Sequence, residues 1–156
     1  MAYGRSWTPA WRLHPPAPAS QLATVPRPFS VLVVEDHDPH RQILEELLAG
    51  RGWKIFATDG SGAALEVARR VRLDFGILDM HLPGSTGLDL FQTIAREIGP
   101  MPSIMMSGEA SKSETDAALA AGVFTFLQKP IAIPELQGAL DLLIQTHFPQ
   151  SPGMSS

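Results

Sequence analysis

Between residues 29 and 148, short apolar runs alternate with longer stretches in which apolar side chains recur every three or four positions. Short runs bounded by Gly, Pro, Asp or Ser are typical of buried strands, and the longer periodic stretches are typical of amphipathic helices. The pattern predicts strands over 29–34, 53–58, 75–79, 102–106 and 123–127. It predicts helices from 38 to Gly50, around Ala64 to Val71, over 87–98, over 111–121 and from Pro134 onward.

A strand followed by a helix, repeated five times, predicts a fold of the α/β class. Parallel strands need a crossover between them, and the helices that make these crossovers cover both faces of the sheet. We therefore expect one doubly wound parallel sheet of five strands, with the helices divided between its two faces.

The first expected helix carries a start signal. Asp38 precedes Pro39, so we expect Asp38 to be the N-cap and Pro39 to occupy the first helical position. The apolar face of this helix is expected to contain Ile43, Leu44, Leu47 and Leu48.

The first 28 residues differ in composition from the rest of the chain. They contain six prolines and no periodic apolar face, which predicts a flexible arm over 1–28. An alternative is a docking arm anchored by Tyr3, Trp7 and Trp11. No apolar stretch typical of a signal peptide occurs in it. The expected domain covers 29–148, and a short polar tail covers 149–156.

Composition narrows the function classes. The 156 residues include no cysteine, which excludes disulfides and thiolate metal sites and fits a cytoplasmic protein. The first 28 residues carry three arginines and no acid, a charge of +3. The remaining residues carry a charge of −7, which gives the total of −4. An acidic body argues against direct nucleic-acid binding. No apolar run has the length of a membrane-spanning helix.

Polar residues follow the expected strands at the points where they end. Glu35 and Asp36 follow the first strand, Asp79 ends the third, Ser107 ends the fourth and Lys129 follows the fifth. The carboxyl ends of parallel strands share one edge, where ligands bind in open α/β sheets. Carboxylates crowded there need a neutralising cation, and oxygen ligands without Cys or His suit Mg²⁺. Taken alone, Asp79 is either a cap or a reactive group; with the others, it suits binding of Mg²⁺ and a phosphoryl group.

Four segments carry a family resemblance, and their order and spacing match over roughly residues 29–148. They are Val33-Val34-Glu35-Asp36, the run from Ile77 to Gly87 (ILDMHLPGSTG), Met106-Ser107-Gly108, and Phe126-Leu127-Gln128-Lys129-Pro130. With them the chain resembles the receiver domain of bacterial two-component response regulators. The resemblance implies a (βα)5 flavodoxin-like fold with strand order 2-1-3-4-5.

The resemblance also implies a role for each matching residue. Asp79 is expected to be the phosphoacceptor, with Lys129 pairing with it and Ser107 bonding the phosphoryl group. The Mg²⁺ ligands are expected to be Asp36, Asp79 and the Met80 backbone carbonyl, with Glu35 acting through a water. Phe126 matches the aromatic switch position, and the Lys129–Pro130 peptide bond matches one that the family keeps cis.

Some positions depart from the commonest pattern or stay open. Phe126 stands where tyrosine is frequent, so it can signal only by packing, and Ile131 stands where phenylalanine is frequent. His81, two residues after Asp79, is expected on the rim of the site, where it either tunes hydrolysis of the acyl phosphate or faces solvent. Glu109 is expected on the same rim.

The sequence therefore predicts a stand-alone receiver that accepts a phosphoryl group from a sensor histidine kinase. It would signal through protein contacts of the fourth helix, fifth strand and last helix, a face that is also a candidate for homodimer formation, or pass phosphate to a histidine phosphotransfer protein. The alternatives are a fragment of a larger regulator, a binding module that ignores phosphate, and an aspartyl phosphatase. Asp79 does not begin the phosphatase pattern Asp-x-Asp, because the residue two positions after it is His81.

Overall fold

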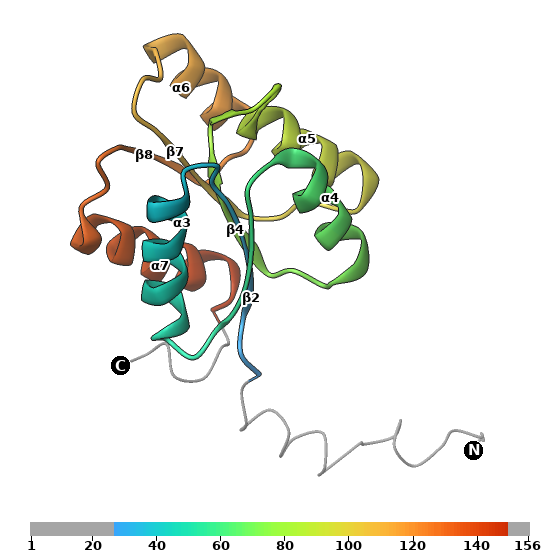
Figure 1. The fold of residues 1–156 in the computed structure, drawn as a ribbon, viewed down its shortest axis with the longest axis vertical. Helices are drawn as coiled ribbons and strands as arrows, with labels where there is room; N and C mark the ends of the chain where they lie inside the picture. Colours follow the sequence, from blue (N-terminus) through green and yellow to red (C-terminus); the bar gives the residue numbers. More distant parts are fainter. Residues whose placement is uncertain (1–26, 150–156) are drawn as a thin grey trace, which may run out of the picture. The chain divides into compact units, whose positions relative to one another are not determined.

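The computed structural model describes residues 27–149, so the predicted arm and tail lie almost entirely outside the described part. Residues 28–147 form one unit, an α/β fold with strands at its centre and helices around them (Figure 1). Its strands are β2 (Ser30–Val34), β3 (Lys54–Thr58), β4 (Phe75–Asp79), β5 (His81–Leu82), β6 (Ser85–Thr86), β7 (Ser103–Ser107) and β8 (Thr125–Gln128). Its helices are α3 (Asp38–Ala49), α4 (Ser61–Arg70), α5 (Gly87–Glu97), α6 (Lys112–Ala120) and α7 (Ile133–His147).

The main sheet has five parallel strands in the order β3-β2-β4-β7-β8. Counted along the chain, this is the order 2-1-3-4-5, so the predicted topology is confirmed. β4 lies in the middle, paired with β2 on one side and with β7 on the other. Every residue of β2, β4 and β7 is buried, as expected for strands covered on both faces.

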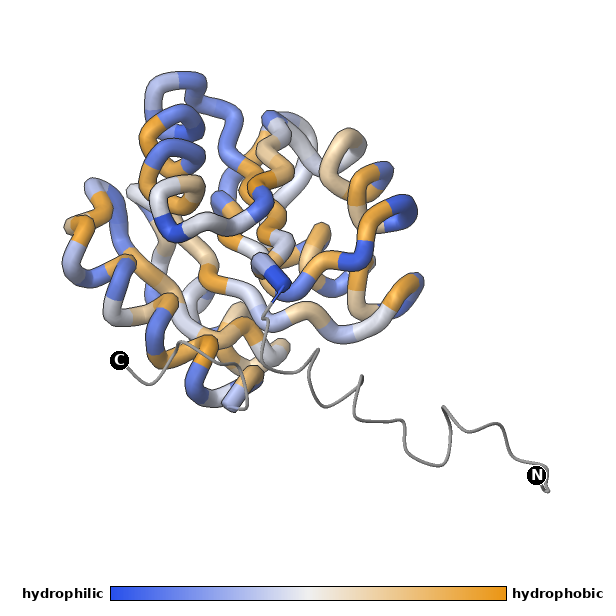
Figure 2. The backbone as a smooth tube through the Cα atoms, turned by 90° about the horizontal axis from the view of Figure 1, so that it is seen from below, coloured by the Kyte–Doolittle hydropathy of each residue, from blue (hydrophilic) through white to orange (hydrophobic). Residues whose placement is uncertain are grey.

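Helices cover both faces of this sheet. One face packs against α4, α5 and α6, whose Ala68, Ile94 and Ala118 belong to a buried cluster with Leu32 and Leu78 of the strands. On α7 the predicted apolar stripe is buried; it consists of Leu136, Leu140, Leu143 and Ile144. Figure 1 shows α3 and α7 next to each other, and Figure 2 shows hydrophobic and hydrophilic positions alternating along the helices.

The structure corrects the prediction for the first helix. His37 is the N-cap of α3 and makes no side-chain cap bond, and Asp38 is the first helical residue, so the prediction of an Asp38 cap is wrong. Asp38 instead pairs with Arg41 one turn along, and its charge lies near the positive end of the helix dipole. On the predicted apolar face, Leu44 and Leu48 are buried, but Ile43 is 53% exposed.

A two-stranded hairpin follows β4, in the segment 80–86 for which the sequence pattern predicted neither strand nor helix. β5 and β6 pair antiparallel, with His81 opposite Thr86 and Leu82 opposite Ser85. Gly84 has a φ of 70°, a left-handed conformation that favours glycine, and so turns the chain between the two strands. Within residues 27–149, no helix combines the length and hydropathy needed to cross a membrane.

Candidate functional site

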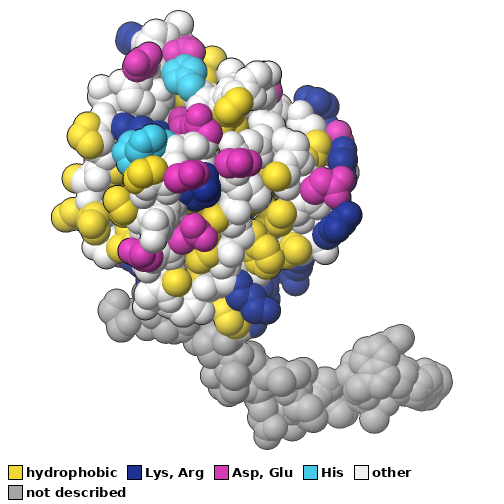
Figure 3. All heavy atoms as spheres, viewed as in Figure 1, with side chains coloured by type: hydrophobic (Ala, Val, Ile, Leu, Met, Phe, Trp, Pro, Cys, Tyr) yellow, Lys and Arg dark blue, Asp and Glu magenta, His cyan; other side chains and the backbone are white. Residues whose placement is uncertain are grey.

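Four strand ends bring the predicted polar residues together at the carboxyl edge of the sheet. Glu35 after β2, Asp79 at the end of β4 and Ser107 at the end of β7 are all buried, with relative exposures of 0%, 5% and 1%. Asp36 is exposed beside them. The central position of β4 explains the arrangement, because it places Asp79 between the ends of its two neighbours. On the face shown in Figure 3, acidic side chains gather near the middle around a basic one.

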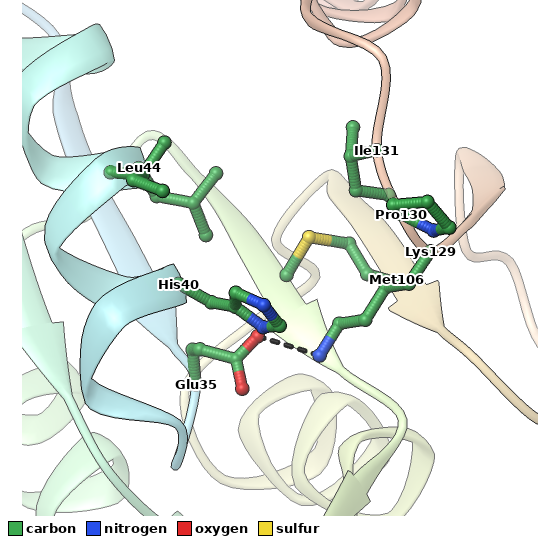
Figure 4. A pocket seen from close by; sticks show the side chains of 8 residues that line it. Glu35, His40, Leu44, Met106, Lys129, Pro130 and Ile131 are labelled. Atoms are coloured by element: carbon green, nitrogen blue, oxygen red, sulfur yellow. Dashed lines mark hydrogen bonds and ion pairs between the residues drawn. The ribbon is translucent and has the colours of Figure 1, made fainter.

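Lys129 joins the two buried carboxylates. Its Nζ lies 2.7 Å from Glu35 Oε1 and 3.0 Å from Asp79 Oδ2, and its side chain is only 19% exposed. The close view in Figure 4 shows the lysine extending from the end of β8 toward Glu35. The Lys129–Pro130 peptide bond is cis, as the resemblance implied. Sequence positions 94 residues apart are therefore in direct contact, as the strand-end prediction required.

The electrostatics of this group are set by burial and by like charges. Burial raises the pKa of Glu35, and the neighbouring Asp79 carboxylate adds to the rise against the lowering effect of Lys129. Burial alone would lower the pKa of Lys129, but its hydrogen bonds to Glu35 and Asp79 outweigh that and raise the pKa. A single ammonium thus balances two buried carboxylates, and a third acid stands at the edge.

Glu35, Asp36 and Asp79 can also hold a cation. Each offers an oxygen, and these ligand atoms lie within 4.8 Å of one another. Carboxylate oxygens without thiol or imidazole ligands fit Mg²⁺. The Met80 carbonyl, the other predicted ligand, accepts a 2.7 Å hydrogen bond from the Gly87 N–H at the start of α5, and its part in metal binding stays a prediction.

Gly87 is a site residue that the sequence did not single out. The hairpin folds the start of α5 back against β4, and a Cβ on Gly87 would lie 2.2 Å from the Asp79 carbonyl oxygen and 2.9 Å from Met105 Sδ. Only glycine permits this approach. The Met80 N–H also donates to the Met106 carbonyl at 2.7 Å, so both backbone polar groups of the residue after Asp79 are hydrogen-bonded.

His81 lies on the rim, as predicted, but it does not simply face solvent. Its N–H donates to Asp79 Oδ1 at 3.2 Å, and its ring Nδ1 lies 3.2 Å from Ser107 Oγ. Its Nε2 lies 3.3 Å from Glu114 Oε2 on α6, a contact with a residue that the sequence did not indicate. Glu109 contributes to the site through its backbone, whose N–H donates to Ser107 Oγ at 3.1 Å. The only sequence signal near Glu114 was its place three residues after Ser111.

Phe126 is partly buried and packs against the apolar cluster on the α4–α6 face. The switch role of this ring stays a prediction. On the other side of Lys129, a cavity of about 250 Å³ lies between α3 and the segment after β8 (Figure 4). Ile131, the second departure from the common pattern, lines this cavity together with His40 and Leu44.

The fold and the site together define a doubly wound α/β protein with an acidic, lysine-bridged site at the carboxyl edge of its sheet. Residues 31–141 match the family model of the response regulator receiver domain. The chain belongs to the response regulator receiver domain family.

Known proteins of the same family are similar over most of the chain. The KDP operon transcriptional regulatory protein KdpE of Escherichia coli is 33% identical over 118 residues, which are 76% of this chain and 52% of KdpE. The sensor histidine kinase AruS of Pseudomonas aeruginosa is 33% identical over 116 residues, which are 72% of this chain and 12% of AruS. The chain thus spans about half of KdpE and a small part of AruS.

Solved structures share the fold. A response regulator receiver domain protein (CheY-like) from Methanospirillum hungatei superposes with a TM-score of 0.73 at 20% identity, covering 78% of this chain and 97% of that one. The non-phosphorylated HemR receiver domain from Leptospira biflexa superposes with a TM-score of 0.70 at 24% identity, covering 76% and 94%.

Proposed function

We propose that this receiver accepts a phosphoryl group on Asp79, in a reaction that depends on Mg²⁺. The observation that carries the proposal is the Lys129 ammonium between two buried carboxylates, 3.0 Å from Asp79 and 2.7 Å from Glu35. An ordinary structural ion pair needs one acid for one base. Burial of the second acid lowers the stability of the fold unless a bound cation or phosphoryl group interacts with it. A dication with a phosphoryl group would use all of these charges.

The chemistry follows from the positions of the side chains. An Asp79 carboxylate oxygen would form a bond to phosphorus while the bond from phosphorus to the donor histidine nitrogen breaks, and that nitrogen keeps the electron pair. Lys129, which contacts Asp79, and the Ser107 hydroxyl, at the end of the neighbouring strand, would stabilise charge on the phosphoryl oxygens. Glu35, Asp36 and Asp79 would hold Mg²⁺, which supplies positive charge to the transferring group. The protein would turn over no separate substrate beyond gaining and losing this group.

For the donor we propose a sensor histidine kinase or a histidine phosphotransfer protein; the relative AruS is itself named a sensor histidine kinase.

For the output we propose protein contacts of α6, β8 and α7, with no direct contact to nucleic acid. Leu119 on α6 and Leu142 on α7 support this, since they are 45% and 56% exposed. A homodimer through this face predicts that the mass in solution rises on phosphorylation and that Leu142→Glu prevents the rise. The stand-alone organisation stays a prediction.

Acetyl phosphate with Mg²⁺ provides the direct test of phosphorylation. The intact protein should gain the mass of one phosphoryl group, and neither Asp79→Asn nor the wild type in excess chelator should gain it. If neither acetyl phosphate nor any phosphohistidine donor modifies the wild-type protein, the proposal is wrong. If the Asp79→Asn variant is modified as strongly as the wild type, the site is elsewhere.

A further inference from the structure

A chain of hydrogen bonds leads from the buried Ser107 hydroxyl to the start of α6. Ser107 Oγ lies 3.2 Å from His81 Nδ1, and His81 Nε2 lies 3.3 Å from Glu114 Oε2. The other oxygen of Glu114 accepts the Ser111 N–H at 3.0 Å, and Ser111 Oγ accepts the Glu114 N–H at 3.1 Å. These last two bonds form the capping box of α6. The site and the first turn of this helix are therefore connected through a single imidazole ring.

The donors and acceptors give this series of hydrogen bonds a direction. The hydrogen bond from the Ser111 backbone lowers the pKa of Glu114, so its carboxylate is ionised and can only accept. His81 Nε2 must then carry a hydrogen, and in the neutral ring Nδ1 is an acceptor. The Ser107 hydroxyl therefore donates a hydrogen bond to Nδ1, while Ser107 Oγ accepts the Glu109 N–H at 3.1 Å.

A phosphoryl oxygen on Asp79 needs the same proton. Such an oxygen can only accept hydrogen bonds, and a serine hydroxyl has one proton to donate. Ser107 must therefore leave His81 before it can bond a phosphoryl group. When it leaves, the ring loses one of the two side-chain contacts that hold it between Ser107 and the start of α6.

We propose that His81 is a positioning residue that holds the Ser107 hydroxyl away from the phosphoryl group, and that Glu114 enforces this by fixing which ring nitrogen carries the hydrogen. The inference rests on the proposed function, since it concerns the same site. For His81 the sequence left two alternatives open, tuning of acyl phosphate hydrolysis and exposure to solvent, and the inference assigns it the positioning of Ser107. It also gives the first turn of α6 a direct connection to Asp79.

The substitution Glu114→Gln reverses the direction of these hydrogen bonds without breaking the connection. The amide oxygen of glutamine can still accept the Ser111 N–H, so the capping box survives, and the amide NH₂ then faces His81 Nε2. Two donors cannot bond each other, so the ring is expected to move its hydrogen to Nδ1 and donate to Ser107 Oγ, which frees the hydroxyl proton. Glu109→Gln is the matched control: it removes the same charge from the same rim, and the Glu109 side chain makes no hydrogen bond within the described residues.

Ring ¹⁵N shifts in solution report the tautomer of His81 directly, before any phosphorylation. At a pH of about 8, where an ordinary imidazole is neutral, we expect the Nε2–H form in the wild type and in Glu109→Gln, and the Nδ1–H form in Glu114→Gln. The Nδ1–H form in the wild type, or the same form in the wild type and Glu114→Gln, would overturn the inference.

The affinity for beryllium fluoride with Mg²⁺, a stable stand-in for the phosphoryl group, tests the consequence. A hydrogen bond of ordinary strength corresponds to about fivefold in affinity, so Glu114→Gln and His81→Ala should bind about fivefold more tightly than the wild type. His81→Asn, whose side-chain oxygen can replace Nδ1 as an acceptor, should stay near the wild-type value. Equal affinities throughout would overturn the inference and leave the proposed function intact. No binding by the wild type would overturn the proposed function and the inference with it.

Discussion

Asp74 and Asp79 lie at opposite ends of β4 and are equally buried, with exposures of 6% and 5%. Asp74, just before the strand, exchanges bonds with Ser30: its Oδ2 accepts the Ser30 N–H at 2.8 Å, and its own N–H donates to the Ser30 carbonyl at 2.8 Å. Asp79 instead faces a second buried carboxylate, an exposed one, and the ammonium of Lys129.

The comparison shows that burial does not identify a functional carboxylate. The Asp74 carboxylate ties the start of β4 to β2, near an edge-to-face group of Phe29, Trp53 and Phe75. At the other end of the strand, like charges are concentrated at a cost to stability, which is typical of a site built for a ligand. Substitutions that affect one end and leave the other intact test this reading.

The largest effect is expected from Gly87→Ala, which disturbs only the Asp79 end of the strand. The added methyl group would overlap the Asp79 carbonyl, so the backbone of β4 or α5 must shift, at a cost of about 4 kcal/mol in the free energy of unfolding. Gly62→Ala in α4 is the control, since nothing lies within 4 Å of its Cβ position, and it should gain up to about 1 kcal/mol. Urea denaturation of both variants measures the contrast; similar midpoints would disprove the close approach.

Lys129→Met should remove about 3 kcal/mol at neutral pH, because it leaves Glu35 and Asp79 buried without their cation. Lowering the pH, which lets one carboxyl take up a proton, should recover part of this loss. Lys112→Met is the surface control, where the lysine is 88% exposed beside Asp116 and the expected change is below about 0.5 kcal/mol. Equal losses in both variants, from chemical denaturation, would contradict the account.

The two aspartates themselves should respond with opposite signs. Asp74→Asn weakens a charge-assisted bond to the Ser30 N–H and should cost about 2 kcal/mol, with phosphorylation retained. Asp79→Asn removes one of the crowded charges and should gain about 1 kcal/mol, with phosphorylation lost. Thermal melts with parallel acetyl phosphate assays give both values, and a shared sign would remove the distinction between the two ends.

The smallest effect concerns pH. Burial raises the pKa of Glu35 above its ordinary value of 4.5, so the folded protein keeps this proton at pH values where the unfolded chain has lost it. Its contribution to stability is complete below pH 4.5 and is lost as the pH rises through the raised value. The wild-type stability curve should contain this declining part, and Glu35→Gln should lack it. Parallel curves for the two proteins would mean that the Glu35 pKa is not raised.

Much of this was predictable from the sequence because it depends on local patterns. Apolar runs ending in Asp79 and Ser107 gave the strands, and the parallel sheet then placed Glu35 and Lys129 at the same edge. The Asp38 cap was mispredicted because an acid in the first helical turn is favoured for the same electrostatic reason as an N-cap. Gly87 and Glu114 were missed because their roles depend on the hairpin after β4 and on the position of α6, which no local pattern specifies.

The location of the phosphoryl group is the most direct test of the central claim. The phosphorylated wild-type protein, reduced with borohydride to trap the acyl phosphate and then fragmented for sequencing by mass spectrometry, should carry its single modification at Asp79. Asp74, although equally buried and within the same peptide, should be unmodified. Modification at Asp74, Glu35 or Asp36 in place of Asp79 would contradict the account.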